Sequence, residues 1–88
     1  KSRLGFAFDS SAGFTFPDGA VRSPDVTWIL KERYLALPTS DRQKFAHIVP
    51  DFVIELRSLS DNLKELKEKM QAYLENGVRL GFLIDRVS

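Results

Sequence analysis

Cysteine is absent from this 88-residue sequence, and histidine occurs only once, as His47. Without cysteine the chain can form no disulfide, no zinc-thiolate site and no thiol nucleophile, and this composition fits a reducing cytoplasm. A single histidine cannot build a histidine-rich metal site. No partner residue is spaced around His47 for catalysis, so we expect it to have a helix-end or packing role.

Long apolar runs and a strong charge of either sign are also missing. No run approaches the ~20 residues of a membrane span, and no secretory signal pattern is present, so we predict no membrane partner and a cytoplasmic location. The 13 lysines and arginines nearly balance the 12 acidic residues, which gives a net charge of +1. Overall charge therefore does not support long-range attraction to nucleic acid, and DNA binding would need a local basic patch.

The size of the chain limits its core. With 43% hydrophobic and 28% charged residues, the composition is that of one ordinary soluble domain. A chain of this size buries only a little over roughly 60% of its unfolded surface, which leaves little to support a half-exposed face. The sequence also starts at Lys1 and stops directly after an apolar segment. We therefore predict that residues 1–88 form a single domain that is incomplete.

One segment, residues 50–57, combines strong strand propensity with charge. Because alternate side chains of a strand point to opposite faces, one face is predicted to carry only Phe52, Ile54 and Leu56. The other face carries Asp51, Val53, Glu55 and Arg57. A carboxylate and a guanidinium in so apolar a strand are costly to bury unpaired. Glu55 and Arg57 are therefore expected to be paired, exposed at a cleft, or involved in binding a cation.

The residues before this strand predict further strands and two short helices. Residues 3–22 alternate weakly, with turn clusters at 9–13 and 17–19, which predicts a hairpin. Residues 21–30 predict another strand, with Pro24 at its start and Asp25 where it enters the sheet. A lone acid at such a position is most often a turn or cap residue. Residues 31–37 and 41–46 predict short helices, the second starting from a capping box of Ser40 and Gln43.

The last third of the chain predicts a strand-helix-strand unit. Apolar residues fall at helical spacing from 62 to 76, with Ser60 or Asp61 as the N-cap and Asn76-Gly77 at the end. Residues 80–85 form an apolar run typical of a buried strand. A right-handed crossover would make this strand parallel to residues 50–57. We therefore predict an α+β fold with a mixed sheet and flanking helices.

The predicted sheet brings charged residues together. If strand 21–30 pairs antiparallel with strand 51–57, Asp25 faces Glu55 and Arg57. Two carboxylates at a sheet edge suit a hard cation such as Mg²⁺, which takes oxygen ligands and keeps several waters. Such a cation polarises a phosphate and activates water. Lys69, which flanks the buried stripe of its helix, or Arg57 would offset charge on the phosphate oxygens.

Short motifs in a fixed order carry a resemblance to a known family. They are Ser-Pro-Asp at 23–25, Pro-Asp-Phe-Val-Ile-Glu-Leu-Arg-Ser at 50–58, Ser-Asp at 60–61, Lys69 with Tyr73, Asn-Gly-Val at 76–78 and Leu-Gly-Phe-Leu-Ile-Asp at 80–85. Together they cover nearly all of the chain, which resembles the Uma family of "putative restriction endonucleases", a branch of the PD-(D/E)XK nuclease superfamily. The resemblance implies a restriction-endonuclease-like sheet, DNA cleavage dependent on Mg²⁺ or Mn²⁺, and a homodimer. The opening helix of the superfamily has no counterpart in this sequence.

The resemblance assigns roles position by position. Asp25 matches the first acid and Glu55 the second, both as metal ligands. Arg57 stands where the superfamily pattern has its lysine, and arginine stays protonated, so it holds phosphate but cannot act as a base. Lys69 on the following helix is the candidate for a migrated lysine. Asp51 matches the second Pro-Asp of the family and is expected to be structural.

The resulting prediction is a metal-dependent DNA endonuclease with Asp25, Glu55, Lys69 and Arg57 at its site. The alternative, favoured by the arginine at position 57 and by the near-neutral charge, is a catalytically silent nuclease-fold module used for binding or assembly. A third interpretation is a structural sheet-and-helix unit in which Glu55 and Arg57 pair only with each other.

Overall fold

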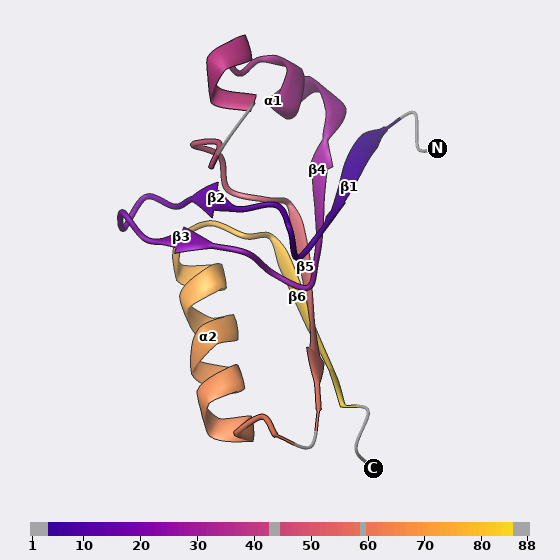
Figure 1. Cartoon of the computed structure of the whole chain (residues 1–88), viewed down its shortest axis with the longest axis vertical. Coiled ribbons are helices and arrows are strands. Elements are labelled where there is room, and N and C mark those ends of the chain that lie inside the picture. The colour runs from indigo at the N-terminus through magenta and orange to yellow at the C-terminus, as the bar shows by residue number, and fades with distance from the viewer. Residues whose placement is uncertain (1–3, 43–44, 59, 86–88) are drawn as a thin grey trace.

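The structure, a computed structural model, describes residues 4–42, 45–58 and 60–85. Its elements follow in the order β1 (Gly5–Asp9), β2 (Phe14–Thr15), β3 (Val21–Arg22), β4 (Val26–Leu30), α1 (Lys31–Leu35), the short 3-10 helix η1 (Thr39–Arg42), β5 (Phe52–Arg57), α2 (Leu63–Glu75) and β6 (Leu80–Asp85). Figure 1 shows α2 running alongside the sheet, with α1 at the opposite end of the molecule. None of the described helices is both long enough and apolar enough to cross a bilayer.

Four of the strands form a mixed sheet in the order β1-β4-β5-β6. β4 is antiparallel to both of its neighbours, whereas β5 and β6 are parallel. The register of the parallel pair runs from Phe52 opposite Leu80 to Arg57 opposite Asp85. The predicted crossover through α2 is therefore confirmed, and with it the α+β fold with a mixed sheet and flanking helices.

The hairpin predicted across the turn at residues 9–13 is wrong. β1 pairs with β4, from Gly5 opposite Leu30 to Asp9 opposite Val26, while β2 pairs with β3 in a separate two-stranded sheet. The turn at residues 17–19 does close a hairpin, and Gly19 adopts the left-handed conformation there (φ 87°). The single strand predicted over residues 21–30 is accordingly divided. Pro24 has no N–H for a ladder bond, so the chain leaves one sheet and enters the other around this residue.

Two helix boundaries also differ from the sequence prediction. Residues 39–42 form a 3-10 helix where an α-helix was predicted over 41–46, of which residues 43 and 44 lie outside the described part. The N-cap of α2 is Asn62, not Ser60 or Asp61, and its side chain accepts hydrogen bonds from the backbone N–H groups of Lys64 and Glu65. Gly77 follows the helix with φ 110°, as the Asn-Gly pair predicts.

α2 and the β2–β3 hairpin cover one face of the four-stranded sheet and bury the core. Its buried members are Phe14, Phe16, Ile29, Ala46, Ile48, Val53, Tyr73 and Val78. α2 approaches β6 so closely that a Cβ on Gly81 would lie 2.1 Å from the sulfur of Met70. A larger residue at this position would require the Met70 side chain to shift, and the close approach brings the side chains of α2 onto β5.

The opposite face of the sheet is apolar and is covered by no described element. A shallow groove on this face is lined by Ala7, Val26, Trp28, Phe52, Ile54, Leu80 and Phe82. The Trp28 and Phe52 rings stack there at 5.2 Å, and Phe82 on the edge strand is 49% exposed. The sheet thus has one packed face and one face that meets solvent with apolar side chains.

Candidate active site

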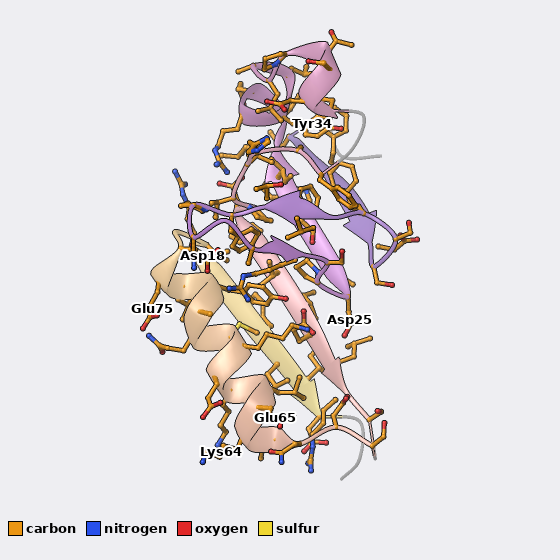
Figure 2. The ribbon with its side chains drawn as sticks, turned by 60° about the vertical axis from the view of Figure 1, so that its left-hand side comes forward. Asp18, Asp25, Tyr34, Lys64, Glu65 and Glu75 are labelled. Carbon is orange, nitrogen blue, oxygen red and sulfur yellow. The ribbon has the colours of Figure 1, made fainter. Side chains whose placement is uncertain are left out.

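The pairing of β4 with β5 brings Asp25 and Glu55 together. Val26 lies opposite Ile54, so one residue further along the same antiparallel register Asp25 lies opposite Glu55. Asp25 also accepts a 2.8 Å hydrogen bond at Oδ2 from the backbone N–H of Leu56. Figure 2 shows Asp25 at the start of β4. The antiparallel pairing predicted from the sequence is confirmed, and both carboxylates line one pocket of about 330 Å³.

Glu55 is almost completely buried, with 3% of its surface exposed. Its Oε1 lies 3.3 Å from Nζ of Lys69, and its Oε2 accepts a 2.8 Å hydrogen bond from the Tyr73 hydroxyl. A carboxylate removed from water needs a counter-charge and hydrogen-bond donors. α2 supplies both, from two positions one helical turn apart.

Lys69 lines the same pocket as the two carboxylates. Its position beside the buried stripe of the helix had predicted that it leans toward the sheet. Its side chain is 41% exposed although its ammonium pairs with a buried acid. The side chain therefore remains partly in contact with solvent while its ammonium pairs with Glu55. Lys67, two residues earlier, lies on the outer surface of α2 with Lys64 and Glu68.

Arg57 is not part of this group. Its Nη1 donates a 2.9 Å hydrogen bond to Oδ2 of Asp85, the residue directly beside it on β6. The ion pair of Glu55 with Arg57, which the structural interpretation required, is therefore not found. Arg57 pairs with Asp85 because the parallel register of β5 and β6 places these two residues side by side. Both oxygens of Glu55 contact Lys69 and Tyr73 instead.

Asp61 is a third carboxylate lining the pocket, and sequence reasoning missed it. Its Oδ2 accepts hydrogen bonds from the backbone N–H and the hydroxyl of Ser58, at 2.9 and 3.1 Å. These bonds lower the pKa of Asp61, and the charges of Lys69 and Arg57 lower it further. The sequence places Asp61 in the loop directly after the strand that carries Glu55, and this could have indicated that it lines the pocket. We had interpreted Asp61 only as a possible helix cap.

Tyr73 is the second residue that the site prediction left out. It is fully buried, and burial raises the pKa of Tyr73 far above that of a free tyrosine, with the hydrogen bond and charge of Glu55 adding to the effect. The phenol is therefore protonated and acts as a donor. Its position four residues after Lys69, on the same helix face, was the signal in the sequence.

Asp51 and His47 lie away from the acids. The buried Asp51 carboxylate accepts hydrogen bonds at Oδ2 from the backbone N–H of Leu30 and from Arg33, at 2.8 and 2.9 Å. Asp51 thus ties the start of β5 to the end of β4, which is the structural role expected of it. His47 is exposed, with Nδ1 3.3 Å from Oδ1 of Asp41.

The residues of the pocket fit a cation held by few protein ligands. The described ranges contain no group of three or more histidine, cysteine or acidic residues placed to hold a metal ion. Mg²⁺ does not need such a cage, since it usually keeps several waters and binds through one or two carboxylates plus phosphate oxygens. Asp25 and Glu55, which line one pocket, are two carboxylates of the kind that such a site uses.

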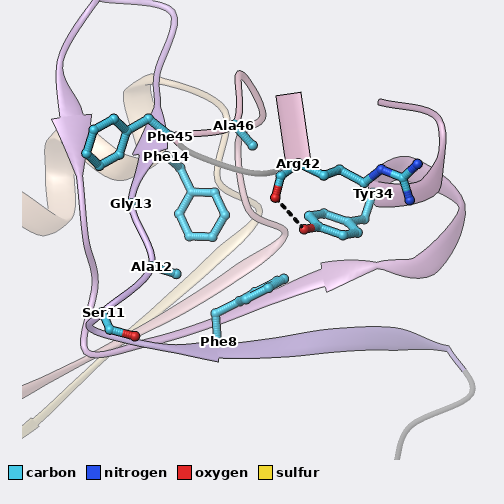
Figure 3. Close-up of a pocket in the computed structure, with 9 residues that line it drawn as sticks. All are labelled: Phe8, Ser11, Ala12, Gly13, Phe14, Tyr34, Arg42, Phe45 and Ala46. Atoms are coloured by element: carbon cyan, nitrogen blue, oxygen red, sulfur yellow. Dashed lines mark hydrogen bonds between the residues drawn. The ribbon is translucent and has the colours of Figure 1, made fainter. Parts of the chain in front are cut away.

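A second pocket, of about 310 Å³, lies near α1 and η1 and has a different character. Figure 3 shows the rings of Phe8, Phe14 and Tyr34 turned into it, with the Tyr34 hydroxyl donating a 3.3 Å hydrogen bond to the carbonyl of Arg42. Its lining holds no carboxylate. Of these two pockets, the one that Asp25 and Glu55 line is the one with described acidic residues.

Comparison with known proteins gives this arrangement a context. The crystal structure of "a putative nuclease belonging to DUF820" from Anabaena variabilis ATCC 29413 superimposes with a TM-score of 0.74 at 24% identity, and the match covers 94% of this chain. The match covers 45% of the Anabaena chain, so this sequence spans less than half of that protein. No curated protein matches the sequence. The family model Uma2, described as "Putative restriction endonuclease", matches residues 1–88. The chain thus belongs to the Uma2 family of nuclease-like proteins.

Proposed function

We propose that this chain carries the active site of a metal-dependent DNA endonuclease, in which Asp25 and Glu55 hold Mg²⁺ or Mn²⁺. One observation carries the proposal: two carboxylates from adjacent strands and the ammonium of Lys69 line a single pocket. Family membership supports a nuclease, and DNA is the substrate that it suggests. The share of the Anabaena protein that is matched makes the activity of the whole protein part of this proposal.

The residues of the pocket would divide the work. A bound divalent cation supplies Lewis-acid polarisation of the phosphate and a more acidic water. Lys69 would leave Oε1 of Glu55 and place its ammonium against a phosphate oxygen, which its half-exposed side chain permits. A positive charge fixed near developing negative charge lowers the barrier to phosphodiester cleavage. The positive charge of Lys69 lowers the pKa of Asp61. Attraction between the two side chains would keep the ammonium at the pocket.

Arg57 is proposed to act by its charge at the margin of the pocket. Arginine cannot transfer a proton at neutral pH, and this guanidinium is anchored by Asp85. The charge of Arg57 contributes to lowering the pKa of Asp61, and this supports an electrostatic role. Lys69 is accordingly the residue that replaces the lysine of the superfamily pattern.

Three further features belong to the same proposal. Residues 1–88 are proposed to form a single, incomplete nuclease-like domain, which the match of one family model to all of them supports. The protein acts as a homodimer, as the family resemblance suggests, and it works in the cytoplasm, where its DNA substrate lies. Light scattering on the purified protein measures the oligomeric state directly.

The decisive experiment compares Glu55→Gln with the wild type in two assays. Calorimetry with Mn²⁺ should show binding to the wild type and a loss of at least about tenfold in affinity for the variant, because a neutral amide is a poor ligand for a hard cation. Nicking of supercoiled plasmid with Mg²⁺ should fall in parallel. Glu68→Gln, on the outer surface of α2, is the matched control.

The outcomes separate the two functions considered. Equal Mn²⁺ affinity for the wild type and Glu55→Gln would refute the proposed site. Binding of Mn²⁺ and DNA by the wild type without any cleavage would instead identify the silent nuclease-fold module.

A further inference from the structure

We propose that Tyr73 is a positioning residue that fixes the orientation of Glu55 and so determines which of its oxygens faces the pocket. The inference rests on the proposed function of this site. It goes beyond that function by assigning a task to a residue outside the expected set of acids and lysine.

The two donors to Glu55 differ in how firmly they are held. The Tyr73 hydroxyl lies 2.8 Å from Oε2 and its residue is fully buried, whereas the Lys69 ammonium lies 3.3 Å from Oε1 on a side chain that is 41% exposed. A tyrosine has two side-chain torsions, but a lysine has four. Lys69 is therefore free to move to a substrate, and Tyr73 is the donor that remains.

Contacts on the far side of the ring keep Tyr73 in place. The ring of Phe16, from the β2–β3 hairpin, packs against it with centroids 5.8 Å apart, and the guanidinium of Arg22 lies over Phe16 at 5.6 Å. Arg22 in turn forms a 2.7 Å ion pair with Asp18, whose backbone N–H donates to the Asn76 side chain at the end of α2. The hairpin is thus fastened to the same helix and closes over Tyr73.

The geometry has a direct consequence for the carboxylate. With Oε2 held by a buried donor, the Glu55 side chain stays in one rotamer, and Oε1 stays on the side of Lys69 and the pocket. A partner that holds a metal-binding carboxylate in one orientation typically contributes 10–100-fold to metal affinity or activity. Tyr73 would do this without contacting the cation or the DNA.

The test is Tyr73→Phe, which removes one oxygen atom and keeps the ring. Its control is Tyr34→Phe, since Tyr34 is the other of the two tyrosines in the chain and its hydroxyl contacts a backbone carbonyl in the other pocket. Mn²⁺ affinity is measured by calorimetry. Side-chain couplings of Glu55 are measured by NMR in the absence of metal. We expect Tyr73→Phe to bind Mn²⁺ about tenfold more weakly and to average its Glu55 couplings over several rotamers, while Tyr34→Phe matches the wild type in both.

Each result bears on a different claim. Wild-type affinity together with a single Glu55 rotamer in Tyr73→Phe would overturn the positioning role. A wild type that binds no Mn²⁺ refutes the proposed cation site, and the NMR comparison then still decides whether Tyr73 orients Glu55. If Tyr73→Phe does not fold, the wild type labelled with 3-fluorotyrosine replaces it. The fluorine signal of residue 73 should then shift in Glu55→Gln and that of residue 34 should not; two unmoved signals would also overturn the proposal.

Discussion

At the scale of single residues, Lys69 and Lys67 show how position on a helix decides the task of a charge. The two are two residues apart on α2, yet Lys69 pairs with the buried Glu55 whereas Lys67 lies on the outer surface. An exposed charge on a helix surface contributes a few tenths of a kcal/mol through weak pairs. Lys69 instead compensates a carboxylate that has almost no water around it.

We therefore expect Lys69→Ala to reduce plasmid cleavage by about a hundredfold, the usual scale for removing a charge that stabilises a transition state. Lys67→Ala should retain wild-type activity and serves as the matched control. Initial rates of nicking at saturating Mg²⁺ measure both. Equal losses in the two variants, or none in either, would remove Lys69 from the site.

Some residues of the candidate site could be predicted from their place in a single strand or helix, whereas others depend on contacts between elements. Asp25, Glu55 and Lys69 were predicted because each stands at a recognisable place in a strand or on a helix. Asp85 was not foreseen as the partner of Arg57, because that pairing depends on the register between two strands. The hydrogen bond from Tyr73 to Glu55 was missed for a similar reason, since an apolar helix stripe does not show which of its members carries a polar contact.

At the scale of elements, α2 is the carrier of the site, and Gly81 is what allows it to lie on the sheet. The missing side chain of Gly81 leaves room for Met70, so α2 sits close enough for Lys69 and Tyr73 to reach β5. The order of strand, helix and strand was predicted correctly because its signals are local, but the prediction of a buried strand over residues 80–85 is wrong, since β6 is an edge strand with one apolar face exposed. The partner of β1 was also not predicted correctly, because tertiary packing and not the nearest turn selects β4.

Replacing Gly81 by valine should push α2 away from the sheet. We expect a loss of roughly 1–3 kcal/mol in the free energy of unfolding, the usual cost of forcing extra carbons into a packed site. Gly81→Ala should cost less, since the Met70 side chain can shift. Urea unfolding followed by circular dichroism measures both. A Gly81→Val variant as stable as the wild type would show that the close approach of α2 is not needed.

At the scale of the whole molecule, the two faces of the sheet differ in their exposure to solvent. One is sealed by α2 and the β2–β3 hairpin, while the other presents Val26, Leu80, Phe82 and Ile84 at 37–49% exposure. Apolar patches of this kind promote association in water. Chain length predicted a small core with little to support a half-exposed face, but the sequence did not show which face of the sheet would lie open.

Phe82→Thr should therefore reduce self-association of the 88-residue chain while changing the free energy of unfolding by less than about 1 kcal/mol, because the ring is half exposed and threonine also favours strands. Concentration-dependent light scattering and urea unfolding measure the two quantities. Val53→Thr, on the buried face, is the contrasting control and should destabilise the fold. Unchanged association of Phe82→Thr would mean that this face does not drive it.

The hydrogen bond between Asp25 and the backbone of Leu56 also bears on the order in which the protein assembles. Glu55 meets Lys69 and Tyr73 across 14 and 18 residues, whereas the Asp25 contact spans 31. Loops that are shorter close at a smaller entropic cost, so the crossover unit can form before β4 docks. In a folding chain, Glu55 would then be paired with Lys69 and Tyr73 before Asp25 is brought next to it. The acid pair proposed to hold the cation would then be completed only when β4 docks on β5.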